Sequence, residues 1–194
     1  MMRANRLLIA AILLSLLQIG FLGSMIFSRA AVLRNGTEVL LRIQPVDPRD
    51  LLRGDYVILS YDISRIPVSL VANVPTGMTT TAEGPIWVRL AKGADNHFTA
   101  VAASLGERPV APPAPGEVDI RGHLSAGWSL AADATLNPDY GIERFYLPEG
   151  EGLAIQNDMR ERPFSVKVAV AKDGTAQIKS LLDGDTVLFD EPLY

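Results

Sequence analysis

Two histidines are the first residues to consider for chemistry, because imidazole can ligate a metal ion or act as a general base near neutral pH. His97 and His123 each stand alone in a segment that is strand-like in composition. Neither has a second histidine or an acid at the spacing of a metal site. We therefore interpret both as strand residues that are half-buried or at the surface. A Ser-His-Asp triad stays open, because its members need not be neighbours in sequence, although no Gly-x-Ser-x-Gly elbow supports one.

Acidic residues are a second candidate, because several carboxylates could surround a hard cation such as calcium. They lie in two regions of the chain: Asp47, Asp50, Asp55, Glu143, Glu149 and Glu151. Arginines stand in the same two regions: Arg49, Arg53 and Arg144. Opposite charges this close in sequence favour ion pairs over metal binding, so we predict no metal site. Phosphate-binding glycine loops and dinucleotide fingerprints are absent from the sequence, and we predict no cofactor.

A serine–lysine hydrolase is a third possibility, because type I signal peptidases are also membrane-anchored, β-rich proteins. Residues 54–57 (Gly-Asp-Tyr-Val) are similar to a Gly-Asp-hydrophobic strand of those enzymes. They carry a serine just beyond the anchor and a lysine base on a later strand. Here Ser24 lies inside an apolar run and the first lysine is Lys92, so the serine has no activator. The sequence favours a non-enzymatic protein without catalytic residues, with an inactive relative of these peptidases as an alternative.

The chain contains no cysteine and carries a net charge of −4 at neutral pH. Missing thiols exclude disulfides, thiolate zinc sites and cysteine nucleophiles. A mildly acidic chain without a cluster of lysine and arginine is not typical of a nucleic-acid-binding protein. We therefore expect no nucleic acid among its partners.

The run from Leu7 to Phe27 contains no charge and one strongly polar side chain, Gln18. A helix of this length spans roughly the 30 Å of a bilayer core, since each residue adds about 1.5 Å. We predict an uncleaved membrane anchor at residues 1–29, in contact with the lipid bilayer through Leu7 to Phe27, and a separate domain at residues 30–194. A signal peptide cleaved near Ala30 is the alternative.

Arginines flank the apolar run on both sides, so the charge rule for orientation is nearly balanced. The short N-terminal flank with Arg3 and Arg6 favours a cytoplasmic N-terminus. The predicted location is the inner (cytoplasmic) membrane, crossed once, with the C-terminal domain extracytoplasmic or periplasmic. That domain carries a net charge of −6, because 16 of the 18 basic residues and all 22 acidic residues follow Phe27. Anionic headgroups would not attract it, so the anchor must provide the tether.

Short alternating or β-branched segments dominate the rest of the chain and are predicted to form strands, among them residues 56–63. The clearest prediction is a hairpin around Asp173-Gly174, because Asp-Gly between two alternating strands is typical of a tight turn. Residues 66–83 are rich in proline and threonine and are predicted to form a surface loop, and residues 153–160 one or two helical turns. The fold class is mainly β: an antiparallel sheet or partly closed barrel with little helix, preceded by one N-terminal transmembrane helix.

One segment, residues 53–61, combines arginine, glycine, an acid and two tyrosines. Its candidate binding residues are Arg53, Gly54, Asp55, Tyr56, Leu59 and Tyr61. Gly54 can adopt a backbone conformation that a side chain would disfavour, and Asp55 can accept turn amides or pair with Arg53. Side chains alternate along a strand, so Leu59 and Tyr61 share one face. The segment is therefore interpreted as a strand entrance with a core face, or as a binding surface on the Asp/Arg-rich loop.

The same segment resembles the signature of the bacterial GDYXXLXY family, and it matches all five fixed positions of that string. Residues 47–53 and 140–150 are similar to this family too, so the resemblance runs from about residue 36 to residue 188. It implies a bacterial, membrane-anchored protein of a family with no assigned activity. It also implies a multi-spanning membrane protein as the partner.

Three functions follow from these patterns. The leading hypothesis is a membrane-anchored, non-enzymatic accessory domain that binds or stabilises a membrane-protein partner. The alternatives are an extracytoplasmic ligand- or peptide-binding domain, with a pocket lined by Tyr56, Tyr61, Trp87 or Trp128, and a hydrolase. A serine, lysine, histidine or aspartate cluster within hydrogen-bond reach would keep the hydrolase in consideration.

Overall fold

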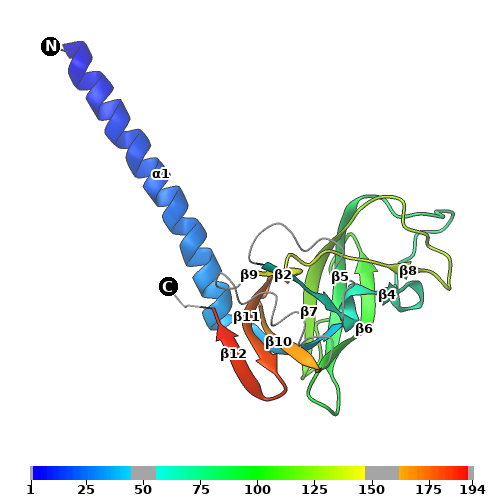
Figure 1. The fold of residues 1–194 in the computed structure, drawn as a ribbon. Helices are drawn as coiled ribbons and strands as arrows, with labels where there is room; N and C mark the ends of the chain where they lie inside the picture. Colours follow the sequence, from blue (N-terminus) through cyan, green and yellow to red (C-terminus); the bar gives the residue numbers. More distant parts are fainter. Residues whose placement is uncertain (1, 45–55, 147–161, 192–194) are drawn as a thin grey trace.

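A long helix stands away from a β-rich domain in the computed structural model, which describes residues 2–44, 56–146 and 162–191 (Figure 1). The helix α1 (Met2–Asn35) contains the whole apolar run. Within Ala11–Asn35 an 18-residue window reaches a mean hydropathy of 2.0, so this stretch is long and apolar enough to cross a membrane. The described apolar side chains from Ile9 to Phe27 are exposed, as at Phe27, which is 77% exposed. The prediction of one N-terminal apolar helix is confirmed.

The last turns of α1 pack on the domain, and the helix ends six residues beyond the predicted anchor boundary at residue 29. Ala30 and Leu33 are buried. Gly36 then turns the chain directly into the first strand, and its amide donates to the Val32 carbonyl at 2.8 Å. A Cβ at this position would lie 2.6 Å from that oxygen and 3.0 Å from the Val170 amide, so only glycine fits without a shift. The helix and the sheet are therefore joined without a linker.

The larger sheet is antiparallel and has the strand order β12-β11-β10-β1-β3. Its strands are β1 (Thr37–Gln44), β3 (Ser60–Tyr61), β10 (Phe164–Val170), β11 (Ala176–Asp183) and β12 (Thr186–Asp190). The predicted hairpin is confirmed, since β10 pairs with β11 through a turn at Gly174, whose φ is +81°. Glycine adopts this left-handed conformation at little cost.

A second antiparallel sheet has the order β6-β5-β7, with β5 (Gly84–Lys92), β6 (Phe98–Leu105) and β7 (Glu117–Leu124). Two short antiparallel pairs join β2 (Tyr56–Ile58) to β9 (Arg144–Tyr146) and β4 (Ile66–Pro67) to β8 (Thr135–Leu136). The 3₁₀ turns are η1 (Asp62–Ser64) and η2 (Val68–Leu70). One continuous apolar cluster draws side chains from both larger sheets and both short pairs.

The predicted antiparallel, mainly β fold is confirmed, and in the described part of the chain the sheets are open rather than closed into a barrel. Two local predictions were wrong. The predicted strand 56–63 is broken, because β2 and β3 pair with different partners and η1 follows. Residues 66–83 are not only surface loop, because Ile66 and Val68 are buried in the core. The helical turns predicted at residues 153–160 lie outside the described residues.

Candidate functional site

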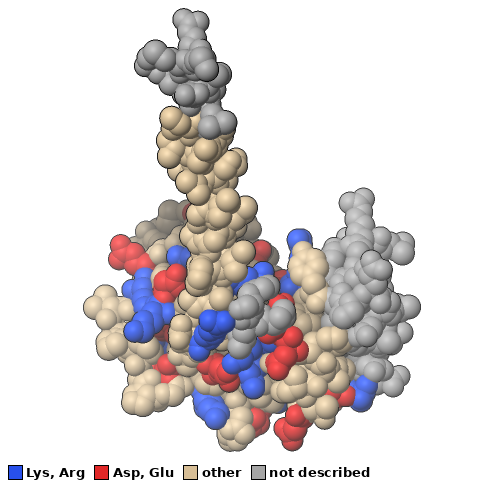
Figure 2. Space-filling view, turned by 90° about the vertical axis from the view of Figure 1, so that its left-hand side faces the viewer, with Lys and Arg blue, Asp and Glu red and all other residues tan. Residues whose placement is uncertain are grey.

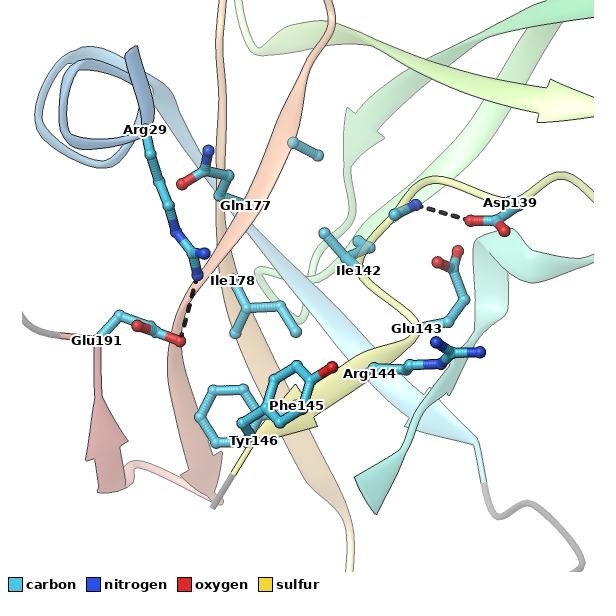
Figure 3. Close-up of a pocket in the computed structure, with 12 residues that line it drawn as sticks. Arg29, Asp139, Ile142, Glu143, Arg144, Phe145, Tyr146, Gln177, Ile178 and Glu191 are labelled. Atoms are coloured by element: carbon cyan, nitrogen blue, oxygen red, sulfur yellow. Dashed lines mark hydrogen bonds and ion pairs between the residues drawn. The ribbon is translucent and has the colours of Figure 1, made fainter. Parts of the chain in front are cut away.

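A cavity of about 540 Å³ lies at the base of the domain, where α1 meets the sheet (Figure 3). We call it the root groove and define it by six of its lining residues: Arg29, Gly141, Glu143, Tyr146, Gln177 and Glu191. In Figure 3, Arg29 and Glu191 stand on one side, and Asp139, Glu143 and Arg144 on the other. The groove is thus built from α1, from β11, from the segment after β12, and from the chain that leads into β9.

Arg29 connects the groove to the apolar helix. Its guanidinium lies 3.7 Å from the carboxylate of Glu191, just beyond β12. Arg29 follows Phe27 by two residues, which is about 3 Å along a helix axis. Figure 2 shows the same change on the surface: the tan helix gives way to interspersed basic and acidic side chains where it meets the domain. The groove therefore opens at the level where the apolar surface of α1 ends.

Gln177 contributes an unusual polar atom to the groove wall. Its Oε1 is buried and, among the described side chains, has no hydrogen-bond partner. A buried acceptor without a donor costs about 1–3 kcal/mol, because it has lost water and gained nothing. An N–H group from a molecule bound in the groove would remove that penalty.

Two carboxyl groups line the opposite wall. The Gly141 amide donates to Asp139 at 2.8 Å, and the Tyr140 amide donates to Glu143 at 2.7 Å. Burial and the neighbouring Asp139 raise the pKa of Glu143. Hydrogen bonds from the Glu143 carboxyl and the Gly141 amide lower the pKa of Asp139. The two opposite shifts make Asp139 the stronger acid of the pair, so a proton shared between the two carboxyls resides on Glu143.

Two tyrosine hydroxyls hold this wall in place, because each donates across to a carbonyl beside the other tyrosine. Tyr61 donates to the carbonyl of Ile142 at 2.5 Å, and Tyr140 donates to the carbonyl of Ile63 at 2.8 Å. The amide of Leu59 adds a bond to the carbonyl of Glu143 at 2.8 Å. Burial raises the pKa of both phenols well above the ordinary value. Neutral hydroxyls therefore fix the segment that carries Glu143.

The candidate binding residues of the segment 53–61 fall into three groups. Arg53, Gly54 and Asp55 lie outside the described residues. Only the backbone of Tyr56 is described, and it pairs with Tyr146 in the β2–β9 ladder. The side chains of the remaining two, Leu59 and Tyr61, are 2% and 1% exposed and belong to the core. Around Leu59 and Tyr61 the structure therefore agrees with the strand-and-core interpretation. The other family-like segment, residues 140–150, instead lines the root groove in its described part, Gly141 to Tyr146.

Sequence reasoning did not single out the groove residues Arg29, Gln177 and Glu191 as a site. Arg29 could have been found, because it is the first charge after the apolar run. Gln177 and Glu191 carry no such signal, since their position depends on how β11 and β12 pair. Ser24, tested above as a nucleophile, donates to the carbonyl of Phe21 on the exposed side of α1.

Other predicted ligand residues lie elsewhere. Tyr61 and the two tryptophans, Trp87 and Trp128, are not among the residues that line the root groove. The guanidinium of Arg108 instead lies over the ring of Trp87, 5.2 Å from the ring centre, in a cation–π contact. Within the described residues, no three His, Asp or Glu side chains are grouped closely enough to hold a metal ion.

An apolar helix that runs without a linker into a β-rich domain defines a helix-tethered β-domain protein. The GDYXXLXY protein family model matches residues 18–181, and the chain therefore belongs to this family. The family membership predicted from the two motifs is confirmed. No curated protein and no solved structure matches the chain.

Proposed function

We propose that this protein is a membrane-anchored accessory protein whose root groove binds an extramembrane segment of a multi-spanning membrane protein. One observation carries the proposal: Arg29, the first charge after the apolar run, is part of the groove wall. A groove at that level faces the headgroup region once α1 crosses a bilayer. Loops of a neighbouring membrane protein emerge at this same level.

The bilayer and the orientation are part of the proposal. Described side chains from Ile9 to Phe27 are mostly more than half exposed, although they are apolar, and a bilayer would cover them. The two arginines near the N-terminus, Arg3 and Arg6, favour a cytoplasmic start. The β-rich domain then lies on the extracytoplasmic side of a bacterial inner membrane.

A polypeptide segment suits the groove better than an apolar ligand. The unpaired Gln177 acceptor requires an N–H donor, and the walls carry charges of both signs. A stable protein interface buries more than about 1,000 Å², which the groove alone cannot supply. The exposed face of α1 extends the contact into the bilayer, and Arg29 joins the two surfaces.

The test uses the buried Oε1 of the half-buried Gln177, where the effects of a substitution on stability and on binding have opposite signs. Gln177→Leu removes the unpaired acceptor, so we expect the free energy of unfolding to rise by about 1 kcal/mol. The same substitution removes the hydrogen bond to a partner, so capture of that partner by cross-linked pull-down of tagged full-length protein should fall. The matched control is Gln44→Leu, which removes a glutamine bonded to Asp62 outside the groove. Equal capture by wild type and Gln177→Leu would contradict the proposal.

A second candidate is the binding of a free peptide or small solute in the same groove. The volume of about 540 Å³ supports it, since ligand pockets usually measure about 300–1,000 Å³. Native mass spectrometry of the detergent-purified protein separates the two functions. A small adduct that Gln177→Leu removes supports a free ligand, whereas capture of a membrane protein without such an adduct supports the accessory function.

A further inference from the structure

Asp95 and His97, two residues apart in one turn, form a continuous chain of contacts with the distant Ser165 on the outer face of the larger sheet. The Nε2 of His97 lies 2.9 Å from the Oγ of Ser165, near the start of β10. The Nδ1 of the same ring lies 3.2 Å from the Oδ2 of Asp95, in the turn between β5 and β6. A serine, an imidazole and a carboxylate in this order are the parts of a nucleophilic triad.

The carboxylate determines which nitrogen of His97 carries the proton. The backbone amide of His97 donates to Asp95 at 3.3 Å, and Arg42 donates to Asp95 at 2.6 Å. An ionised carboxylate beside Nδ1 favours the tautomer with hydrogen on that atom. The Nε2 atom then has a free lone pair, so it accepts the hydroxyl proton of Ser165. This is the arrangement that a general base requires.

The Ser165 side chain is reachable although the residue is only 6% exposed. It lines a cavity of about 400 Å³, together with Leu40, Arg42, Asn96 and His97. The cavity is wide enough for an acyl group, and Arg42 and Asn96 bring N–H donors to its wall. Such donors are needed where negative charge develops on a carbonyl oxygen.

The cavity lies away from the root groove. Thr37 pairs with Val170 beside the end of α1, whereas Arg42 pairs with Ser165 at the opposite end of the same ladder. Five residues of strand separate the two pairs, which is about 17 Å. A substrate would reach Ser165 from the aqueous side of the domain and not from the bilayer.

We propose that Ser165 is an activated nucleophile that accepts acyl groups from small, water-soluble carboxylic esters. The Oγ attacks the ester carbonyl while Nε2 of His97 takes the hydroxyl proton, and Asp95 holds the ring. The carbon–oxygen bond to the alcohol breaks, and the alcohol leaves with the proton from His97. Water then adds to the acyl carbonyl and gives a proton to His97. The acyl carbon–Oγ bond breaks, Oγ takes that proton back from His97, and the carboxylic acid leaves. This activity is separate from the accessory function.

The absence of cysteine provides a direct test in full-length protein in detergent micelles. The S165C variant carries one thiol, and its alkylation by iodoacetamide is followed against pH. An ordinary thiol has a pKa of about 8.5. We expect the S165C profile to have its midpoint at least about one pH unit lower, because His97 takes the proton, and the S165C/H97Q profile to return to the ordinary midpoint.

The matched control is S180C, on β11. The hydroxyl of Ser180 bonds to the carboxylate of Asp190 instead of an imidazole, and the residue is also buried, at 2% exposed against 6% for Ser165. Identical midpoints for S165C and S165C/H97Q would overturn the proposal. So would an S165C thiol that reacts only after the protein is unfolded, because the site would then be closed to substrate.

A second measurement uses the unmodified nucleophile. Wild-type protein is treated with a fluorophosphonate probe and with p-nitrophenyl acetate, and the modified residue is located by mass spectrometry. We expect a single adduct on Ser165, with a labelling rate that H97Q lowers at least about tenfold while the variant melts as the wild type does. No adduct, or one that persists in S165A, would refute the activity.

Discussion

The hydroxyls of Tyr61 and Tyr140 connect the segment 56–63 to the wall of the root groove. Tyr61 and Ile142 are 81 residues apart in sequence, and Tyr140 and Ile63 are 77 apart. Alternation along the strand placed Leu59 and Tyr61 on one face, and both are in the core. The partner of each hydroxyl could not be predicted, because a phenol can donate to any nearby carbonyl and only the assembled fold selects one.

Glu143 gives the clearest pH prediction at the residue scale. Its pKa is raised in the folded protein, chiefly by burial. A raised folded pKa contributes stability that is fully present below the unfolded value of 4.5 and is lost as the pH rises through the folded value. Glu143→Gln keeps a hydrogen donor for Asp139 at every pH. We therefore expect this variant to lose less stability than the wild type from pH 4.5 upward, as measured by urea unfolding.

Asp139 serves as the control, because its pKa is shifted in the opposite direction to that of Glu143. Its pKa is lowered, first by the hydrogen bond from Glu143, so its contribution is present above 3.8 and is lost as the pH falls. Asp139→Asn should therefore flatten the acid side of the same stability curve. If Glu143→Gln and the wild type unfold identically at all pH values, the shared proton is not part of the folded state.

At the element scale, the local sequence predicts the hairpin between β10 and β11 more clearly than any other element. Asp-Gly between alternating strands indicated a turn, and Gly174 has the left-handed φ of +81° that the turn requires. The same turn also packs against another sheet, since the amide of Arg121 in β7 donates to the carbonyl of Gly174 at 2.9 Å. That second role has no local signal, because it depends on the packing of two sheets.

Gly174→Ala tests both roles at once. The left-handed backbone alone costs a side chain about 1–2 kcal/mol. A Cβ would also lie 2.6 Å from the ring of Trp87 and 2.9 Å from the backbone nitrogen of Arg121. We expect a total loss of about 2–5 kcal/mol in the free energy of unfolding.

Gly184→Ala is the matched control for that substitution. Gly184 also has a positive φ, +56°, but a Cβ there would meet nothing within 4 Å. Its loss should be confined to the backbone penalty of about 1–2 kcal/mol. Equal losses for the two alanine variants, measured by urea unfolding, would show that the hairpin does not press on the second sheet.

Strand boundaries in the middle of the chain are harder to predict, because they too depend on which strands pair in the assembled fold. Residues 56–63 have uniformly β-forming composition, but β2 pairs with β9 and β3 pairs with β1. Composition indicates that a segment can be extended, and it does not indicate where the segment changes partner. Ile66 was assigned to a surface loop because of its neighbours, yet it is fully buried against the core.

For the whole molecule, the helix and the fold class follow from composition, whereas the groove does not. The 21 uncharged, mostly apolar residues from Leu7 to Phe27 predict one long helix in any context. The root groove requires Arg29, Gln177 and Glu191 from three parts of the chain to meet. The pairing of β11 with β12 positions Gln177 and Glu191, and Gly36 brings Arg29 to them because it carries α1 into β1 without a linker.

The proposed function requires that the root groove hold a segment of another membrane protein. The most direct measurement places a photo-crosslinking amino acid at Tyr146, which is 69% exposed in the groove, in full-length protein in its own membranes. Val101 on β6, 42% exposed and outside the groove, is the control position. We predict one discrete adduct with a multi-spanning membrane protein from position 146 and none from position 101. Adducts with lipid alone, or the same products from both positions, would contradict the claim.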